Sequence, residues 1–225
     1  MKVGILGTGG VGRALAEGFA AGGHEVMVGT RDVDATMARS ETDQLGNPPF
    51  SEWRSVHGDV AVGAFPEAGA HGEMLVNATS GAGSLEALRA AGAGDVDARI
   101  LIDASNALDF SGGFPSLFVA VTDSLAERIQ REFPSVRVVK AWNTMTAGLM
   151  TNPELVGAGD HSIPICGNDE DAKRRVVALL EGFGWRDVVD LGDLTGARAM
   201  EAYLLFWLRL YGAAGTSMLN TKVVR

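Results

Sequence analysis

The fold is decided by residues 3–12, which read VGILGTGGVG. The first four are apolar, as in a buried strand, and an apolar pattern of helical period runs from Val11 to Ala21. Between strand and helix the glycines match the spacing G-x-G-x-x-G. There the first glycine permits a tight turn, the second lets the backbone approach a pyrophosphate, and the third lets helix and strand pack closely. We therefore predict a dinucleotide-binding turn made of Gly7, Thr8, Gly9, Gly10, Val11 and Gly12.

Short apolar runs continue to alternate with helical stretches along the chain. Strands are expected at Glu25–Val28, Asp59–Val62, Met74–Asn77, Ile100–Asp103 and Val136–Lys140, and helices at Ser84–Ala91 and Ser116–Glu132. Continuous apolar strands with helices between them predict an α/β fold with a doubly wound, mostly parallel sheet of the Rossmann type. We assign residues 1–147 to this dinucleotide-binding domain.

The pattern changes after Ala147. The residues that follow predict a strand at Ser162–Cys166, a helix at Asp169–Phe183, a strand at Arg186–Val189 and a long apolar helix from Thr195 to about Tyr211. No Ser-rich linker or block of charge separates them from the sheet, so residues 148–225 are expected to form a small C-terminal α/β annex packed on it. Because Tyr203–Leu208 is apolar on every face of its helix, one side should meet the sheet. Another side should meet a partner in a homodimer, an acceptor pocket, or both.

Composition narrows the classes of function. The 225 residues carry a formal charge of -9, which argues against general affinity for nucleic acid or anionic lipid, since both need a cationic surface. The start of the chain lacks the features of a signal peptide, and no apolar run approaches the ~20 residues that span a bilayer. The single cysteine, Cys166, lies in an apolar run and suits a reducing cytosol. We expect a cytoplasmic protein that binds no nucleic acid, no membrane and, because its histidines show no ligand spacing, no metal.

The end of the second strand indicates which dinucleotide is bound. NAD-binding domains usually place Asp or Glu there to accept a hydrogen bond from the ribose 2′-hydroxyl. Here Thr30 and Arg31 offer a hydroxyl and a guanidinium to a 2′-phosphate. We assign Asp32 to capping the next helix; the alternative makes Asp32 the ribose ligand and NAD the cofactor. The sequence thus predicts NADP(H), held by Thr30 and Arg31.

Three further runs accompany the glycine turn: Gly29-Thr30-Arg31-Asp32, Val139-Lys140-Ala141-Trp142-Asn143-Thr144, and Cys166-Gly167-Asn168-Asp169 before a helix. With them the chain resembles the coenzyme F420-dependent NADP oxidoreductase family over nearly its whole length. It is also similar to the NADPH-binding domains of the membrane ferric reductases called six-transmembrane epithelial antigens. The resemblance implies an NADPH-dependent oxidoreductase that transfers a hydride between nicotinamide and coenzyme F420, a deazaflavin, or a flavin. In such enzymes the cofactors carry the chemistry, and the protein supplies stacking, orientation and exclusion of water.

The same resemblance assigns further residues. Beside the pyrophosphate and the nicotinamide ribose it places Asn77, Ala78, Thr79 and Ser80. The nicotinamide and acceptor pocket is expected at Asn143–Ala147, with Asn143 and Met145 as candidate catalytic residues and with Asn143 and Ala147 touching the cofactor. The deazaflavin reductases have His where Asn143 stands and the ferric-reductase branch has Asn, so the acceptor stays open between F420 and a flavin or ferric complex. Without the resemblance, Asn143 is equally a residue that caps the following helix.

Two other functions stay open at this point: an NADPH sensor without turnover, and a dehydrogenase of a small imine, hydroxy acid or alcohol. Such a dehydrogenase needs a proton donor, and Lys140 is the one obvious candidate, although at a strand end it is expected to point toward phosphate or helix carbonyls. Ser80 and Ser105 lie in no nucleophile elbow and are interpreted as cofactor contacts. Of two long loops, Gln44–Gly58 and Leu108–Pro115, the second leaves the carboxyl end of a strand, where open α/β sheets bind ligands.

Overall fold

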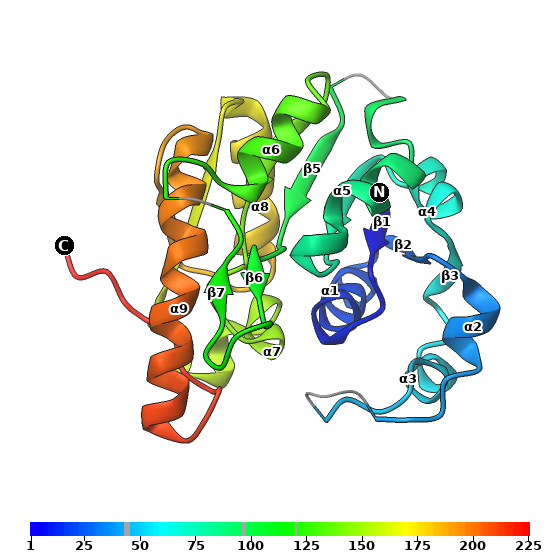
Figure 1. The fold of residues 1–225 in the computed structure, drawn as a ribbon, viewed down its shortest axis with the longest axis horizontal. Coiled ribbons are helices and arrows are strands. Elements are labelled where there is room, and N and C mark those ends of the chain that lie inside the picture. Colours follow the sequence, from blue (N-terminus) through cyan, green and yellow to red (C-terminus); the bar gives the residue numbers. More distant parts are fainter. Residues whose placement is uncertain (43–45, 96–97, 120) are drawn as a thin grey trace.

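An eight-stranded sheet forms the centre of the protein, whose computed structural model describes residues 1–42, 46–95, 98–119 and 121–225. The strand order is β10-β9-β8-β5-β4-β1-β2-β3, and β1, β2 and β3 follow one another toward the right-hand side of Figure 1. These strands are β1 (Lys2–Leu6), β2 (Glu25–Thr30), β3 (Ala61–Ala64), β4 (Met74–Asn77), β5 (Ile100–Asp103), β8 (Arg137–Lys140), β9 (Ser162–Gly167) and β10 (Asp187–Asp190). All neighbours pair in parallel except β8 and β9. The predicted mostly parallel, Rossmann-type sheet is confirmed.

Helices cover both faces of the sheet. One face carries α1 (Gly10–Ala21), α7 (Ala147–Met150) and α8 (Glu170–Gly182). The other carries α4 (Phe65–His71), α5 (Ser84–Ala90), α6 (Leu125–Glu132) and α9 (Ala197–Ala214). Adjacent strand residues such as Ile5 and Leu6 enter different cores, one on each face. Both faces of a strand are thus buried, and for this reason the strands read as continuous apolar runs.

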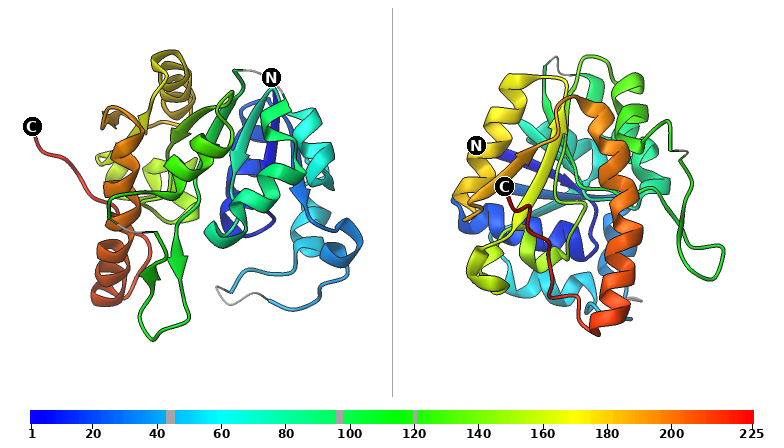
Figure 2. Two further views of the ribbon diagram at one scale, coloured as in Figure 1. Left: turned by 45° about the horizontal axis from the view of Figure 1, so that its top comes forward. Right: turned by 90° about the vertical axis from the view of Figure 1, so that its left-hand side faces the viewer.

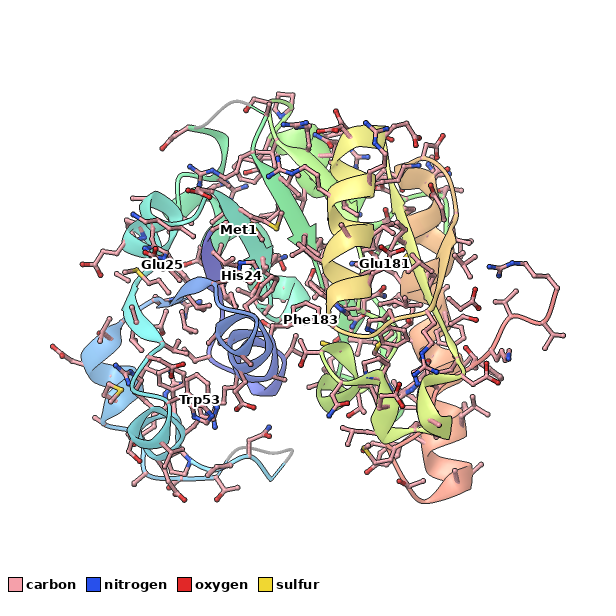
Figure 3. The ribbon with its side chains drawn as sticks, turned by 180° about the vertical axis from the view of Figure 1, so that it is seen from behind. Met1, His24, Glu25, Trp53, Glu181 and Phe183 are labelled. Atoms are coloured by element: carbon pink, nitrogen blue, oxygen red, sulfur yellow. The ribbon has the colours of Figure 1, made fainter. Side chains whose placement is uncertain are left out.

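The C-terminal segment extends the same sheet. β9 pairs with β8 through Lys140 and Cys166, and Cys166 is buried with a free thiol. Phe183, labelled in Figure 3, follows α8 and meets Phe19 of α1 edge to face, with ring centroids 5.2 Å apart. These contacts join the annex to the first βαβ unit. Within the described ranges, no helix is long and apolar enough to cross a membrane.

The helix predicted at Ser116–Glu132 is wrong over its first half. Residues Ser116–Leu117 form β7, which pairs with β6 (Leu108–Asp109) in a hairpin that projects beside α9 (Figure 2). The helix α6 begins only after Ser124, whose hydroxyl accepts a hydrogen bond from Glu127 N at 3.1 Å and donates to the Glu127 carboxylate at 2.7 Å. Ser124 is therefore the N-cap residue that sets the start of the helix.

The long loop Gln44–Gly58 contains a helix that the sequence analysis did not predict. Residues 43–45 lie outside the described residues, and α3 (Phe50–Val56) follows. Trp53, labelled in Figure 3, lies on α3 and donates a hydrogen bond to the carboxylate of Glu17 on α1. The segment is therefore fixed against α1. A second short helix, α2 (Val33–Met37), follows β2, and β3 begins two residues later than predicted.

Candidate dinucleotide site

A groove follows the carboxyl ends of the strands on either side of the point where the strand order reverses, between β1 and β4. It consists of two adjoining pockets, of about 290 Å³ and about 430 Å³, which share Ala78, Thr79 and Ser80. The smaller pocket is lined by the glycine turn and the end of β2, and the larger by the residues after β5 and the start of the β6–β7 hairpin. Open α/β sheets bind their ligands at this kind of position.

The glycine turn has the geometry that its sequence predicts. Gly7 has a φ of +119°, a conformation that favours glycine. A Cβ atom on Gly12 would lie 2.0 Å from the Gly7 carbonyl oxygen, so a larger residue would push α1 away from the turn. At Gly9, by contrast, a Cβ would meet nothing within 4 Å. The space beside Gly9 is open to a ligand.

The start of α1 presents backbone donors to this space. The amide of Arg13 is the first along the helix with a backbone acceptor, the Gly9 carbonyl oxygen at 3.0 Å. The amides of Gly10, Val11 and Gly12 precede it and have no acceptor within the helix. Such amides, with the helix dipole behind them, bind anions.

Asp32 caps the helix after β2, as predicted. Its Oδ1 accepts a hydrogen bond from Ala35 N at 2.8 Å, and its backbone is extended, as is usual for an N-cap residue. The carboxylate is therefore used at the helix start. Asp32 is also not among the residues that line the smaller pocket, whereas Thr30 and Arg31 are.

Two guanidinium groups border the smaller pocket near Thr30. The Arg31 side chain is 75% exposed and lies 3.8 Å from the Glu86 carboxylate, a surface pair of the kind that contributes little. The second is the guanidinium of Arg39. Arg39 is not among the predicted site residues, because no local sequence pattern identifies a basic residue beyond a short helix as a ligand. Thr30 also lines the pocket, and its buried hydroxyl shares a hydrogen bond of 2.7 Å with Thr36.

Asn77 supports the groove from behind. Its amide nitrogen donates to Asp103 at 2.8 Å, and its oxygen accepts from the Thr79 hydroxyl at 2.7 Å. The side chain is fully buried. Ala78, Thr79 and Ser80 are thus the residues of this predicted run that line the groove, and Asn77 fixes their backbone.

Lys140 lies at the centre of a buried ionic network beside the larger pocket. Its Nζ donates to Asp103 Oδ2 at 2.7 Å and to the Ser105 carbonyl at 2.6 Å, and lies 3.2 Å from Glu201 Oε1. Burial lowers the pKa of Lys140, but the charges of Asp103 and Glu201 outweigh it and hold that pKa above its usual value. The expectation that Lys140 points toward phosphate or helix carbonyls is wrong. Its side chain has no exposed surface, so this structure gives no support to Lys140 as the proton donor of a dehydrogenase.

The network extends from the sheet to two helices. Glu201 of α9 accepts hydrogen bonds from the amides of Leu125 and Ala126 at the start of α6, at 2.9 and 3.1 Å. A carboxylate at a helix N-terminus is favourably placed. Ser105, which the sequence analysis interpreted as a cofactor contact, lines the larger pocket and donates its hydroxyl to Asp103 at 2.7 Å.

Asn143 is buried beneath the larger pocket. Its amide nitrogen donates to Asn106 Oδ1 and to the Met200 carbonyl, both at 3.0 Å, and Asn106 lines the pocket. Its Oδ1 is buried and finds no hydrogen-bond partner in the described part of the chain. The following helix α7 starts after Thr146, so Asn143 does not cap it. Met145 is buried beside Asn143, and Ala147 is the first residue of α7.

The outer wall of the larger pocket comes from the β6–β7 hairpin. Leu108, Asp109 and Phe110 of the hairpin contribute to it, and Phe110 is 70% exposed. Further along the hairpin, the guanidinium carbon of Arg209 on α9 lies 3.8 Å from the centre of the Phe114 ring. The groove therefore has two arginines, Arg31 and Arg39, at its β2 end and an exposed aromatic side chain, Phe110, at the hairpin end.

The fold, the glycine turn and the groove define a dinucleotide-binding Rossmann protein. Comparison with known proteins is more specific. Residues 2–107 match the family described as NADP oxidoreductase, coenzyme F420-dependent. A crystal structure from Arthrobacter sp. FB24, provisionally described as an F420-dependent NADP reductase, is 50% identical, covers the whole of both chains and superposes with a TM-score of 0.96. The chain belongs to the coenzyme F420-dependent NADP oxidoreductase family.

Two curated relatives are more distant. Metalloreductase STEAP3 of Rattus norvegicus is 30% identical over 203 residues, which are 89% of this chain and 36% of that protein. The F420-dependent NADP reductase of Methanocaldococcus jannaschii is 31% identical over 103 residues, 44% of this chain and 45% of that protein. The matches thus span less than half the length of either curated relative.

Proposed function

We propose that the protein transfers a hydride between NADP(H) and coenzyme F420, with the groove as its dinucleotide site. One observation carries the choice of NADP(H): Asp32 is engaged as a helix cap, while Arg31 and Arg39 border the pocket at the end of β2. The 2′-phosphate of NADP(H) would then lie between the guanidinium groups of Arg31 and Arg39. The choice of F420 is supported by the family and by the names of two relatives.

Different residues along the groove would bind different parts of the dinucleotide. The amides of Gly10, Val11 and Gly12 would bind the pyrophosphate, Thr30, Arg31 and Arg39 the 2′-phosphate, and Ala78–Ser80 the sugar between them. When bound, NADPH supplies the hydride and the deazaflavin accepts it.

At the nicotinamide end, Ser105 and Asn106 offer polar groups to the ring's carboxamide, and Phe110 excludes water. Asn143 would orient Asn106 from below through its hydrogen bond of 3.0 Å, with Met145 and Ala147 beside it.

The acceptor is tested by anaerobic mixing of the purified protein with NADPH and one of F420, FAD or a ferric chelate. We expect the nicotinamide absorbance to fall only with F420, together with bleaching of the deazaflavin band. Oxidation of NADPH by FAD or by the ferric chelate, but not by F420, would assign the chain to the ferric-reductase-like alternative. Tight NADPH binding without oxidation by any acceptor would favour a sensor.

The nucleotide preference is tested with Arg31→Ala. Loss of a hydrogen bond to a charged group costs about 1.5–3 kcal/mol, so the NADPH dissociation constant should rise about 10- to 150-fold while that of NADH hardly changes. Arg174→Ala is the matched control, because Arg174 is an exposed arginine of α8 that pairs with Asp171 outside the groove. Equal losses for NADPH and NADH would contradict the assignment.

We also propose that α9 contributes to a homodimer. Phe206 and Tyr211 on this helix are 54% and 45% exposed, and apolar side chains gathered at the surface mark interaction sites. Sedimentation equilibrium should show a dimer that Phe206→Glu converts to a monomer. A wild-type monomer at all concentrations would contradict the proposal.

A further inference from the structure

Arg13 is a charged residue held inside the protein behind the glycine turn. It is the residue directly after Gly12 on α1, and it is 8% exposed. Its Nε donates to the Thr8 carbonyl at 2.9 Å, and its Nη1 donates to the Pro48 carbonyl at 2.6 Å. The guanidinium carbon also lies 5.4 Å from the centre of the Phe50 ring. Arg13 thus joins the turn to the segment before α3.

The hydrogen bond to Thr8 fixes the orientation of one peptide group of the turn. No peptide bond among the described residues is cis, and in a trans peptide the carbonyl and the following N–H point in opposite directions. When Arg13 holds the Thr8 carbonyl on its own side, the Gly9 N–H points to the other side. Because Gly7, Thr8 and Gly9 line the smaller pocket and Arg13 does not, the side away from Arg13 is expected to be the side that faces the pocket.

The guanidinium of Arg13 also brings a positive charge close to the Gly9 amide, where the pyrophosphate of a dinucleotide would bind. A cation that donates to the carbonyl polarises the peptide group and strengthens the N–H of Gly9 as a donor. Because Arg13 is largely shielded from water, this charge is screened less than that of an exposed arginine. Arg13 itself lies behind the backbone and need not touch a ligand.

The second hydrogen bond positions the neighbouring segment. With the Pro48 carbonyl held by Arg13, the side chain of Asn47 lies close to the glycine turn, 3.1 Å from where a Cβ of Gly10 would be. Two carbonyls from distant parts of the chain therefore depend on one guanidinium. Lysine has the charge but lacks the planar fork that serves two acceptors at once.

We propose that Arg13 is a positioning residue for pyrophosphate binding, which orients the Gly9 amide toward the ligand and holds the Asn47–Pro49 segment beside it. The inference rests on the proposed function, since it needs the groove to bind a dinucleotide. It predicts that Arg13 affects every ligand that carries the pyrophosphate and no ligand that lacks it. The side chains proposed to bind the 2′-phosphate, in contrast, should distinguish NADPH from NADH.

The test measures the affinities of Arg13→Met and Arg13→Lys for NADPH, NADH and adenosine 2′-phosphate by calorimetry. Arg13→Met should weaken NADPH and NADH by the same factor, about 10-fold, and leave adenosine 2′-phosphate unchanged. Arg13→Lys should recover part of the loss. Arg54→Met is the matched control, because Arg54 also donates to a backbone carbonyl, that of His57 at 2.7 Å, but lies away from the turn.

Unchanged affinity for both dinucleotides in Arg13→Met would overturn this inference and leave the proposed function standing. An equal loss for adenosine 2′-phosphate would also overturn it, since Arg13 would then support the fold in general. If Arg13→Met does not fold, Arg13→Lys decides: affinity equal to wild type for both dinucleotides contradicts the inference. Wild-type protein that binds neither dinucleotide would overturn the proposed function itself.

Discussion

At the end of β2 the charged side chains beside the groove are exposed, whereas at the end of β8 they are buried. The Arg31 side chain keeps 75% of its surface accessible, while Lys140 keeps none. All three donors of the Lys140 ammonium have acceptors inside the protein: Asp103, Ser105 and Glu201. The first arrangement leaves donors available to a ligand, and the second fixes the loops that form the pocket floor. Substitutions at the end of β2 should therefore reduce ligand affinity, whereas substitutions at the end of β8 should reduce the stability of the fold.

The largest effect is expected from Lys140→Met. Removing one member of a buried ion network leaves Asp103 and Glu201 as uncompensated buried charges, at a cost of about 3–5 kcal/mol in the free energy of unfolding. Urea denaturation followed by tryptophan fluorescence measures this. Lys173→Met is the matched control, because Lys173 is also buried but pairs with half-exposed Asp190 and exposed Glu170. If Lys140→Met lowers the free energy of unfolding by no more than Lys173→Met does, the charged side chains at the two ends of the groove do not differ in this way.

The next effect separates two glycines of the same turn. Gly12→Ala places a Cβ 2.0 Å from the Gly7 carbonyl, and overpacking of this kind destabilises by about 1–3 kcal/mol. Gly9→Ala meets no atom within 4 Å, so the stability should stay near wild type while NADPH affinity falls, because the methyl group occupies the space for the pyrophosphate. Thermal unfolding and nucleotide titration of both variants give the comparison. Loss of stability in Gly9→Ala would show that its space is needed by the fold.

The two ends also differ in how far the sequence could predict them. The glycine turn, the β2 end and the Asp32 cap follow from residues that are neighbours in the chain, so a local pattern is enough to predict them. The Lys140 network depends on Glu201, which lies on α9 and meets Lys140 of β8 only when that helix packs on the sheet. No local spacing indicates that contact, so the strand-end position of Lys140 predicts phosphate or helix carbonyls as its partners instead.

Arg13 and the hairpin show the same limit. The sequence places Arg13 on α1, but its partner Pro48 comes from the segment before α3. β6 and β7 are two residues each and, among the residues that the structure describes, pair with no other strand. This pattern is too short to compete with the helical period of the residues that follow. The predictions failed where a side chain or a short strand takes its partner from outside its own element.

The smallest effect is expected from Asp32→Ala. Loss of an N-cap costs about 1 kcal/mol, because Ala35 N loses its acceptor at 2.8 Å. The ratio of NADPH to NADH affinity should not change, since the carboxylate serves the helix and does not read the ribose. Asp34→Ala is the matched control: Asp34 lies in the first turn of the same helix, but it is not the residue at the N-cap position. Thermal unfolding and titration with both nucleotides check the two expectations. A selective fall in NADH affinity would restore Asp32 as a ribose ligand and remove the main reason for assigning the β2 end to NADP(H).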